Sequence, residues 1–402
     1  MILRDIIPYL DKPAVSGSLD TDITGFAYDS RLVGPGIAFV AIRGTHSDGH
    51  DFIGKAIELG AAAIFAEQAP ADDCTVPWVH VRHSRTALAQ AAATLNGFPA
   101  KGLTIAGITG TNGKTTTAFL LHHLFNSAQM RSGLLGTVFY DLGDGEHIPA
   151  SHTTPESLEI QGLLAGMRGN GCRACVMEVS SHALDQDRIH GLPFAAAIFT
   201  NLTQDHLDYH GTMEKYFEAK VKLFQITADS SKRSALIING DDSWGRKLAQ
   251  RFEHTGRVVR FGFGVGCEYR AINVRYDMSG TTFELEAKGR SFLVRKAIRT
   301  LQAELDPAEF LRVHSPSAEV QGHGQPILQF GKQNVALLKL EPAGNYALKL
   351  TFDDGHDSGL FTWDYLYQLA NRQEQLWREY EQALHDAGRT RDPAASVVRL
   401  ML

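Results

Sequence analysis

The chain has 402 residues, of which 44% are hydrophobic and 21% are charged, and its formal net charge is −6. This composition is typical of a globular protein of two or three domains, and the mild acidity gives no general electrostatic reason to bind nucleic acid or an anionic membrane. Acidic residues interrupt the first stretch, MILRDIIPYLDKPAV, where a signal peptide needs an apolar core. No run approaches the ~18 apolar residues of a membrane span.

Four cysteines are too few and too scattered for a disulfide framework, which favours a cytoplasmic protein. Cys172 and Cys175 form a C-x-x-C, but no second cysteine pair accompanies it. We therefore interpret these two residues as buried or incidental rather than as a metal or redox site.

Two α/β segments follow one another along the chain. Residues 1–95 alternate short apolar runs, such as GIAFVAI and VPWVHV, with helical stretches such as DFIGKAIELG, which predicts a small α/β unit. From about 100 to 260 the apolar runs are LTIAGI, ACVMEV, AAAIFTNL and SALIIN. Each is apolar enough for burial on both faces, which predicts a parallel sheet with helices on both sides. EYRAINVRYD and TTFELEAKG are two further strand candidates.

Beyond about 295 the alternation of strand and helix stops. NVALLKLEP and YALKLTFDDGHDSGLFTW predict a small antiparallel sheet, and WDYLYQLANRQEQLWREYEQALHDAG predicts a terminal polar helix. We therefore expect three domains, at residues 1–97, 98–295 and 296–402.

The stretch LTIAGITGTNGKTTT, residues 103–117, has the composition of a phosphate-binding loop. Backbone N–H groups of a glycine-rich turn converge on phosphate oxygens at the positive end of the following helix. Lys114 would supply a positive charge and a threonine hydroxyl would ligate Mg²⁺. The loop is a variant, because Ile108 stands where the strict pattern needs glycine and Gly107 lies one residue earlier.

Acidic and imidazole side chains follow two neighbouring predicted strands. Glu178 and His182 come at the end of ACVMEVSSH, and Asp205 and His206 follow AAAIFTNL. The carboxyl ends of parallel strands meet at one edge of a sheet, which is the edge where the glycine-rich loop must also lie. We favour a divalent-cation site beside the phosphate over mere helix capping.

Lys220 lies on the apolar face of the predicted helix TMEKYFEAKVKLFQI, whereas Lys222 points away. A lysine on such a face should have a lowered pKa unless it is paired, and a neutral amine can react with CO₂ to form a carbamate. Snorkelling of the ammonium to the edge of the face is the alternative.

Together these residues resemble the Mur ligase family, and within it the MurE branch, over residues 1 to about 295. The resemblance rests on DSRLVGPGIAFVAIRGTHSDGHDFI, GITGTNGKTTT, HTTPES, EVSSHALDQDRIHG, FTNLTQDHLDYHGTMEKYFEAK and IINGDDSWG. It implies an ATP-dependent ligase that adds a third amino acid, meso-diaminopimelate or L-lysine, to UDP-N-acetylmuramoyl-L-Ala-D-Glu in peptidoglycan synthesis. It also implies a cytoplasmic, monomeric protein.

The resemblance assigns roles residue by residue. ATP and Mg²⁺ would contact Gly110, Thr111, Asn112, Gly113, Lys114, Thr115 and Thr116, with Asn239 near adenine. A second metal site would consist of Glu178, His206 and carbamylated Lys220, and these residues with Lys114 would carry the catalysis. The muramoyl-dipeptide would contact Thr153, Thr154, Ser180, Gln186 and Arg188, and its uridine end would face Asp29 and Ser30.

The chain departs from this family after about residue 295. No DNPR-like tetrapeptide of the amino-acid-selecting third domain occurs, and EFLRVHSPSAEVQGHG and EPAGNYALKLTFDDGHDSGLFTWDYLYQL resemble instead the gamma-butyrobetaine hydroxylase-like N-terminal domain. Some members of that family bind zinc through cysteines, which this segment lacks, so we interpret His314, His323 and His356 as turn or structural residues.

Three functions follow from these observations. The first is a MurE-type ligase, whose turnover we expect to be absent or weak because closure by a third domain assembles productive geometry. The second is a catalytically inactive nucleotide and UDP-sugar-binding fusion with a C-terminal interaction module of unknown partner. The third is another ligase of the wider Mur and folylpolyglutamate synthetase group, against which HTTPES and EVSSHALDQDR argue.

Overall fold

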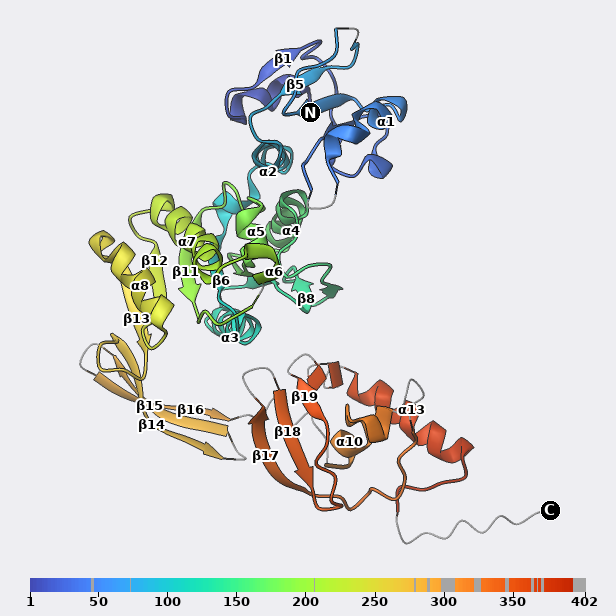
Figure 1. The fold of residues 1–402 in the computed structure, drawn as a ribbon, viewed down its shortest axis with the longest axis vertical. Helices are drawn as coiled ribbons and strands as arrows, with labels where there is room; N and C mark the ends of the chain where they lie inside the picture. Colours follow the sequence, from blue (N-terminus) through green and yellow to red (C-terminus); the bar gives the residue numbers. More distant parts are fainter. Residues whose placement is uncertain are drawn as a thin grey trace, which may run out of the picture. The chain divides into compact units, whose positions relative to one another are not determined.

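The computed structural model in Figure 1 places most of the chain. It describes residues 1–44, 47–72, 74–205, 207–277, 280–287, 290–297, 308–321, 327–343, 347–362, 365–366, 368–369 and 372–392. The chain divides into two compact units, Met1–Glu268 and Tyr269–Leu402. No helix within the described ranges is long and apolar enough to cross a membrane.

A five-stranded sheet in the order β1-β5-β4-β3-β2 begins the first unit. Its strands are β1 Ala14–Ser16, β2 Gly25–Ala27, β3 Ile37–Val40, β4 Ala63–Ala66 and β5 Trp78–His80. Its helices are η1 Leu3–Asp5, η2 Ile7–Tyr9, η3 Ser30–Leu32, η4 Gly49–Phe52, α1 Ile53–Glu58, α2 Ser84–Leu95 and η5 Pro99–Gly102. Only β1 is antiparallel to its neighbour among these strands.

Both faces of this first sheet are covered. Side chains alternate along a strand, so Ala38 and Val40 of β3 join the apolar cluster under α2, while Phe39 joins the one under α1. The predicted small α/β unit is confirmed.

The second sheet of this unit is mostly parallel. Its order is β13-β12-β11-β6-β10-β7-β8-β9, with β8 and β9 as an antiparallel extension. The strands are β6 Thr104–Thr109, β7 Ser132–Leu135, β8 Phe139–Asp141, β9 His147–Pro149, β10 Ala174–Glu178, β11 Phe194–Phe199, β12 Ala235–Asn239 and β13 Val258–Gly262. The helices are α3 Lys114–Ser127, α4 Ser157–Gly169, α5 Ser181–Asp185, α6 Leu207–His210, α7 Met213–Ser230, α8 Ser243–Phe252 and η6 Glu253–Thr255.

Helices cover this sheet from two sides, as the sequence predicts. Helix α3 packs on β6, β7 and β10, whereas apolar side chains of α4, α7 and α8 join the main core cluster on the opposite face (Figure 1). Parallel strands bring the loops after β6, β10, β11 and β12 to one edge. The site residues therefore gather there.

One strand is less buried than predicted. The run SALIIN is apolar enough for burial on both faces, but in β12 only Leu236 and Ile238 are fully buried, while Ala235 and Ile237 are partly exposed. Helices α7 and α8 cover the face of Leu236 and Ile238, and α3 packs mainly against β6, β7 and β10 on the other face. The prediction is wrong for β12 because helix cover on that second face is uneven.

The second unit begins with an antiparallel meander of β14 Tyr269–Asp277, β15 Gly280–Ala287 and β16 Arg290–Ala297. Strand β16 runs across the predicted domain boundary at 295. The C-terminal module has a three-stranded antiparallel sheet with helices, as predicted, comprising α10 Ala308–Val313, α11 Ala318–Gln321, β17 Leu337–Ala343, β18 Ala347–Phe352, β19 Leu360–Thr362 and α13 Gln373–Asp386. Phe310, Leu350, Phe352 and Phe361 form its apolar core.

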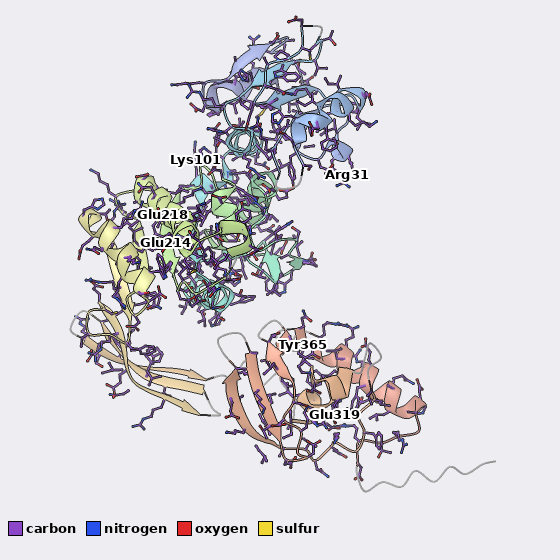
Figure 2. The ribbon with its side chains drawn as sticks, in the orientation of Figure 1. Arg31, Lys101, Glu214, Glu218, Glu319 and Tyr365 are labelled. Atoms are coloured by element: carbon purple, nitrogen blue, oxygen red, sulfur yellow. The ribbon has the colours of Figure 1, made fainter. Side chains whose placement is uncertain are left out.

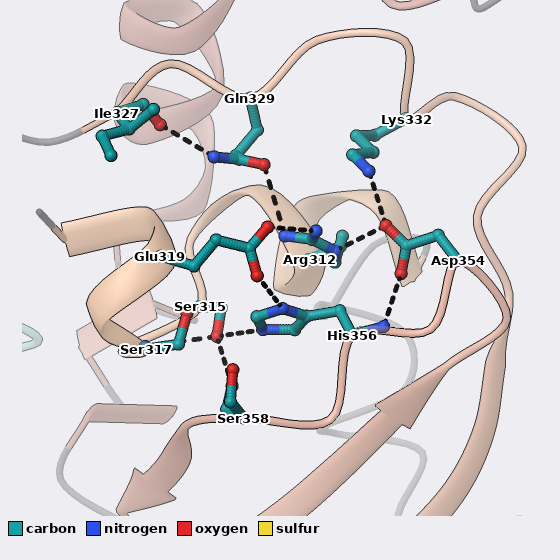
Figure 3. A network of polar contacts seen from close by, with 10 residues as sticks. All are labelled: Arg312, Ser315, Ser317, Glu319, Ile327, Gln329, Lys332, Asp354, His356 and Ser358. Atoms are coloured by element: carbon teal, nitrogen blue, oxygen red, sulfur yellow. Dashed lines mark hydrogen bonds and ion pairs between the residues drawn. The ribbon is translucent and has the colours of Figure 1, made fainter.

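A polar network around the buried side chains of Arg312 and His356 joins α10 and α11 to the loop after β18 (Figure 3). The guanidinium of Arg312 contacts Asp354 at 2.7 Å and Glu319 at 3.0 Å. The His356 ring lies between Glu319 Oε2, 2.7 Å from Nδ1, and Ser315 Oγ, 2.9 Å from Nε2. These contacts connect segments more than 35 residues apart in the sequence, since His356 and Glu319 are 37 residues apart.

The order Ser315, His356, Glu319 has the connectivity of a serine-hydrolase triad, but its burial is reversed. Ser315 is 0% exposed, whereas the Glu319 side chain is 52% exposed. A nucleophile must reach substrate, so this line of contacts is a structural link. His314, whose Nδ1 lies 2.9 Å from the Phe310 carbonyl, is likewise held within the module. These contacts support the predicted structural role of both histidines, while His323 lies outside the described residues.

Candidate functional site

The glycine-rich loop connects β6 to α3 at the carboxyl edge of the parallel sheet. Gly110 has a φ of +152°, and Gly113 caps α3 with a φ of +81°, so both glycines adopt backbone conformations that side chains disfavour. Lys114 is the first residue of α3. Its position at a helix N-terminus, behind a turn rich in N–H groups, is the arrangement that binds phosphate.

The segment after β11 holds this loop in shape. Thr111 donates its N–H to the Asn201 carbonyl at 2.9 Å, and Asn112 donates its N–H to the Asn201 side-chain oxygen at 3.0 Å. The Thr200 hydroxyl donates to the Asn112 carbonyl at 2.7 Å, and Thr203 N–H donates to the Thr111 hydroxyl at 3.0 Å. Sequence reasoning missed these three supporting residues, although polar residues directly after a buried strand were a usable signal.

Two lysines converge on one carbonyl of the loop. Lys114 Nζ donates to Gly110 O at 3.0 Å and to Thr111 O at 2.8 Å, and Lys220 Nζ donates to Gly110 O at 3.0 Å. Burial lowers the pKa of Lys114, and the nearby Glu178 carboxylate partly opposes that shift. Lys114 therefore places a positive charge suited to phosphate at the loop.

Lys220 is 1% exposed on the inner face of α7, where the sequence pattern predicts it. Burial lowers the pKa of Lys220 well below its ordinary value, and the positive charge of Lys114 lowers it further. Its Nζ lies 4.4 Å from the centre of the Tyr216 ring. Lys222 points outward and pairs with Asp185 at 3.3 Å. A buried amine with a lowered pKa is a nucleophile, which is what reaction with CO₂ requires.

Glu178 ends β10 and is 0% exposed. The Thr115 hydroxyl donates to its Oε2 at 3.0 Å, and Thr137 donates its N–H to Oε1 at 3.0 Å and its hydroxyl to Oε2 at 3.1 Å. Burial raises the pKa of Glu178, and the Thr137 N–H partly opposes that shift. Thr137 was missed by sequence reasoning, although it follows β7 at the same edge of the sheet.

Oxygen donors at this edge fit a magnesium ion. The carboxylate of Glu178 and the hydroxyl of Thr115 are hard ligands, and Mg²⁺ takes only one or two protein oxygens beside water and phosphate. Across the described ranges no group of three histidine, cysteine or acidic residues gathers as a metal site. The predicted ligand His206 lies outside the described residues, whereas its neighbour Asp205 is close enough to act on the pKa of both Lys114 and Lys220.

Thr154 links the predicted substrate residues to Glu178, one of the predicted metal ligands. Its hydroxyl donates to the Glu178 carbonyl at 2.8 Å and accepts the Ser180 N–H at 3.0 Å. Arg188 donates to the Thr154 carbonyl at 2.9 Å and to the Gln186 side chain at 2.7 Å. These four residues therefore lie together, next to the end of β10 at Glu178.

The other predicted site residues occupy more separate positions. Thr153 contacts the Thr137 hydroxyl at 3.1 Å, and Asn239 donates to the Thr200 carbonyl at 2.7 Å. Thr116 is exposed on the first turn of α3. After strand β2 Asp29 caps η3 and pairs with Arg31, labelled in Figure 2, at 2.6 Å, and Ser30 is the first residue of η3.

A groove of about 560 Å³ lies along the outer side of α7, away from the loop. Charges of opposite sign line it in pairs, Glu218 with Arg251 at 2.7 Å and Lys222 with Asp185 at 3.3 Å, and Figure 2 labels Glu218. These exposed pairs neutralise one another and Lys215 adds one positive charge on the open surface, so the groove offers a charged ligand less than the loop does.

Family comparisons agree with this geometry. Residues 22–95 match the catalytic domain of the Mur ligase family, and residues 108–298 match the Mur ligase middle domain. The chain belongs to the Mur ligase family. Residues 300–367 match the gamma-butyrobetaine hydroxylase-like N-terminal domain, so both resemblances expected from the sequence are confirmed.

Members of the Mur ligase family are ATP-dependent ligases that form amide bonds. This Mur ligase chain is 42% identical over 283 residues to the UDP-N-acetylmuramoyl-L-alanyl-D-glutamate–2,6-diaminopimelate ligase of Geobacter sulfurreducens, covering 70% of this chain and 55% of that one. It is 39% identical over 297 residues to the UDP-N-acetylmuramyl-tripeptide synthetase of Deinococcus radiodurans, covering 73% and 59%. A solved structure of a UDP-N-acetylmuramoyl-L-alanyl-D-glutamate–2,6-diaminopimelate ligase is similar with a TM-score of 0.60 and 26% identity, covering 74% and 59%. The chain thus spans 55–59% of the length of these relatives.

Proposed function

We propose that the first unit binds UDP-N-acetylmuramoyl-L-Ala-D-Glu and ATP and belongs to a MurE-type ligase that adds meso-diaminopimelate or L-lysine. The observation that carries this proposal is the arrangement at the carboxyl edge of the sheet. There Lys114 and Lys220 meet on one loop carbonyl, and Thr115 bonds to the buried Glu178. Such a site can hold a nucleoside triphosphate and neutralise charge at its γ-phosphate.

The proposed reaction has two steps. The substrate carboxylate attacks the γ-phosphate of ATP, releasing ADP and forming an acyl phosphate, and an incoming amine then displaces phosphate to give the amide. Lys114 would neutralise charge on the transferred phosphoryl group, and Thr115 and Glu178 would hold a magnesium ion. That ion would supply further charge neutralisation at the phosphate oxygens.

Lys220 would be a ligand of a second metal ion after reaction with CO₂. The neutral amine adds to CO₂, a C–N bond forms and one proton leaves, so a buried neutral amine becomes a carboxylate-like anion. The lowered pKa of Lys220 supports this proposal, because only the neutral amine reacts. His206 and Glu178 would complete that second site.

The remaining assignments extend the proposal to the rest of the substrate. Thr153, Thr154, Ser180, Gln186 and Arg188 would contact the muramoyl-dipeptide, Asp29 and Ser30 the uridine end, and Asn239 with residues 110–116 the nucleotide. The domains would be residues 1–97 for UDP-sugar, 98–295 for ATP, and 296–402 as a separate module. A monomeric, cytoplasmic protein that binds no nucleic acid stays a prediction.

A catalytically inactive binding protein is the second candidate. The observation that favours it is that residues 300–367 match a different family from that of residues 22–298. In this case the first unit would bind nucleotide and UDP-sugar without turnover, and the C-terminal module would recruit a partner. The absent or weak turnover that we expect would be less than that of an active ligase, and its complete absence would match this inactive binding protein.

Ligation and binding assays separate these candidates. The protein is incubated with ATP, Mg²⁺, UDP-N-acetylmuramoyl-L-Ala-D-Glu and either amino acid, and product is followed by mass spectrometry. MgATP binding is measured separately, and both candidates should bind it. Lys114→Ala should weaken MgATP binding by about 100-fold, a loss of ~2.7 kcal/mol, because the charge at the phosphates is removed. Lys247→Ala, on the exposed side of α8, is the matched control and should bind as the unaltered protein does.

Tripeptide product would establish the ligase and contradict the expectation of weak turnover. MgATP binding without product would favour the inactive binding protein. Unchanged MgATP affinity in Lys114→Ala would contradict the assignment of the loop itself.

A further inference from the structure

Within the first unit, two polar contacts join the region of the first sheet to helix α4, which packs on the second sheet. The Tyr28 hydroxyl donates to Glu159 at 2.9 Å, and Arg85 in α2 contacts Glu156 at 3.2 Å. Helices α2 and α4 also pack directly on one another. These contacts thus connect the region around Asp29 to the start of α4.

Glu156 lies between two guanidinium groups. Its Oε1 is 3.0 Å from Arg188 Nε, and its Oε2 is 3.2 Å from Arg85 Nη1. The three side chains are only 14–21% exposed, so their interaction is less screened than that of a surface pair. Glu156 is the N-cap residue of α4, but its side chain makes no capping hydrogen bond. Its carboxylate therefore pairs with the two arginines instead of capping the helix.

The Arg188 guanidinium is held from several sides by these contacts. Nε faces Glu156 and Gln186, Nη1 donates to the Thr154 carbonyl at 2.9 Å, and Nη2 donates to Gln186 at 2.7 Å. A guanidinium has five N–H groups, and each Nη keeps one more beyond the described contacts. Two such N–H groups on a fixed plane suit a carboxylate or phosphate.

The line of contacts continues to the metal site. Thr154, which accepts from Arg188, donates its hydroxyl to the Glu178 carbonyl. From Arg85 the connected residues are therefore Glu156, Arg188, Thr154 and Glu178. One continuous polar path runs from α2, beside the first sheet of the unit, to the backbone carbonyl of Glu178, the residue whose carboxylate lies beside the phosphate loop.

We propose that Arg85 and Glu156 are positioning residues that orient Arg188 toward an anionic group at the peptide end of the substrate. This inference rests on the proposed function, because it assumes the UDP-linked acidic peptide as ligand. Arg85 comes from the first sheet's own helix, so the docking of the two sheets sets the angle of a substrate-binding arginine. The balance of two guanidiniums and one carboxylate leaves one positive charge for the ligand.

Differential binding tests this role. UDP and UDP-N-acetylmuramoyl-L-Ala-D-Glu are titrated separately by calorimetry against the full chain and against Glu156→Gln, Arg85→Met and Arg85→Lys. Glu156→Gln and Arg85→Met should weaken binding of the dipeptide ligand by roughly tenfold while leaving UDP affinity unchanged, since only Arg188 loses its orientation. Arg85→Lys keeps the charge and should recover part of the loss.

Glu159→Gln is the matched control. It lies on the same helix and contacts the same first sheet through Tyr28, but makes no described contact with Arg188. It should bind both ligands as the unaltered chain does. Thermal unfolding of each variant separates lost orientation from lost folding.

Three results would overturn the proposal. Unchanged dipeptide-ligand affinity in Glu156→Gln would show that Arg188 needs no orientation. Equal loss of both ligands would show a general interface defect. If the unaltered chain gains nothing from the dipeptide over UDP alone, the proposed function fails first, and this inference fails with it.

Discussion

Replacing Lys220 by methionine should raise the free energy of unfolding at pH 7 by about 1–2 kcal/mol and remove any ligation that the unaltered chain shows. Lys220 is 1% exposed, and burial disfavours its charged form. Methionine fills similar volume without that cost, and the Gly110 carbonyl keeps its bond from Lys114, so no buried acceptor is left unpaired. Urea unfolding of both proteins measures the gain.

The gain should shrink as pH rises. The pKa of Lys220 is lowered in the folded chain, so between that lowered pKa and the ordinary lysine pKa of about 10.4 the unfolded chain binds more of this proton than the folded chain does. That difference destabilises the folded state at neutral pH and vanishes above about pH 10.4. The stability difference between Lys220→Met and the unaltered chain should therefore fall between pH 8 and pH 10.5.

Lys222→Met is the matched control two residues along α7. Its ammonium is outward and paired with Asp185, so its removal should change stability by less than about 0.5 kcal/mol at any of these pH values. A destabilised Lys220→Met with the same pH profile as Lys222→Met would show that Lys220 is charged and satisfied, against the proposed neutral amine.

Bicarbonate adds a separate readout for the carbamate. With ¹³C-bicarbonate the unaltered chain should show a carbamate carbon signal by NMR, and Lys220→Met should lack it. A signal that persists in Lys220→Met would place the adduct on another amine. No signal in either protein would remove the carbamate from the proposed metal site.

The parallel-sheet fold was predictable because its information is local. Buried runs such as LTIAGI and ACVMEV, separated by helices, already determine strand type and the edge where their loops meet. Lys220 was also predictable, since its neighbours at three- and four-residue spacing place it on the apolar face of α7. The uneven cover of β12 was not, because it depends on which strands α3 packs against.

The support of the site could not be read from local pattern. Thr137 and Glu178 are 41 residues apart, and Arg85 and Glu156 are 71 apart. Each of these residues is ordinary in its own segment and gains its role only from the register of strands and the docking of two sheets. The predicted site residues Lys114 and Glu178, by contrast, lie in the loop-to-helix turn after β6 and at the end of β10, where topology alone brings them together.

The second large effect is expected for Gly110→Ala, at the first residue of the phosphate loop. A Cβ there would overlap the Thr200 hydroxyl and lie 3.1 Å from the Asn201 carbonyl oxygen, at a φ of +152°. Neither neighbour can yield, because Thr200 bonds to Asn112 at 2.7 Å and Asn201 O accepts the Thr111 N–H at 2.9 Å. We expect a loss of roughly 3 kcal/mol or more of stability and no measurable MgATP binding.

Substitutions at two other glycines distinguish the cost of steric overlap with a new Cβ from the cost of backbone strain. Gly113→Ala meets nothing within 4 Å but keeps a φ of +81°, so it should cost only about 1 kcal/mol, the penalty of a left-handed residue. Gly162→Ala lies in open space within α4 and should stabilise by about 0.5–1 kcal/mol through helix propensity. Urea unfolding and MgATP titration of all three variants should give this order. Nucleotide affinity retained in Gly110→Ala would mean that the loop can rebuild itself away from Thr200, and that the contacts after β11 are not what shapes the phosphate site.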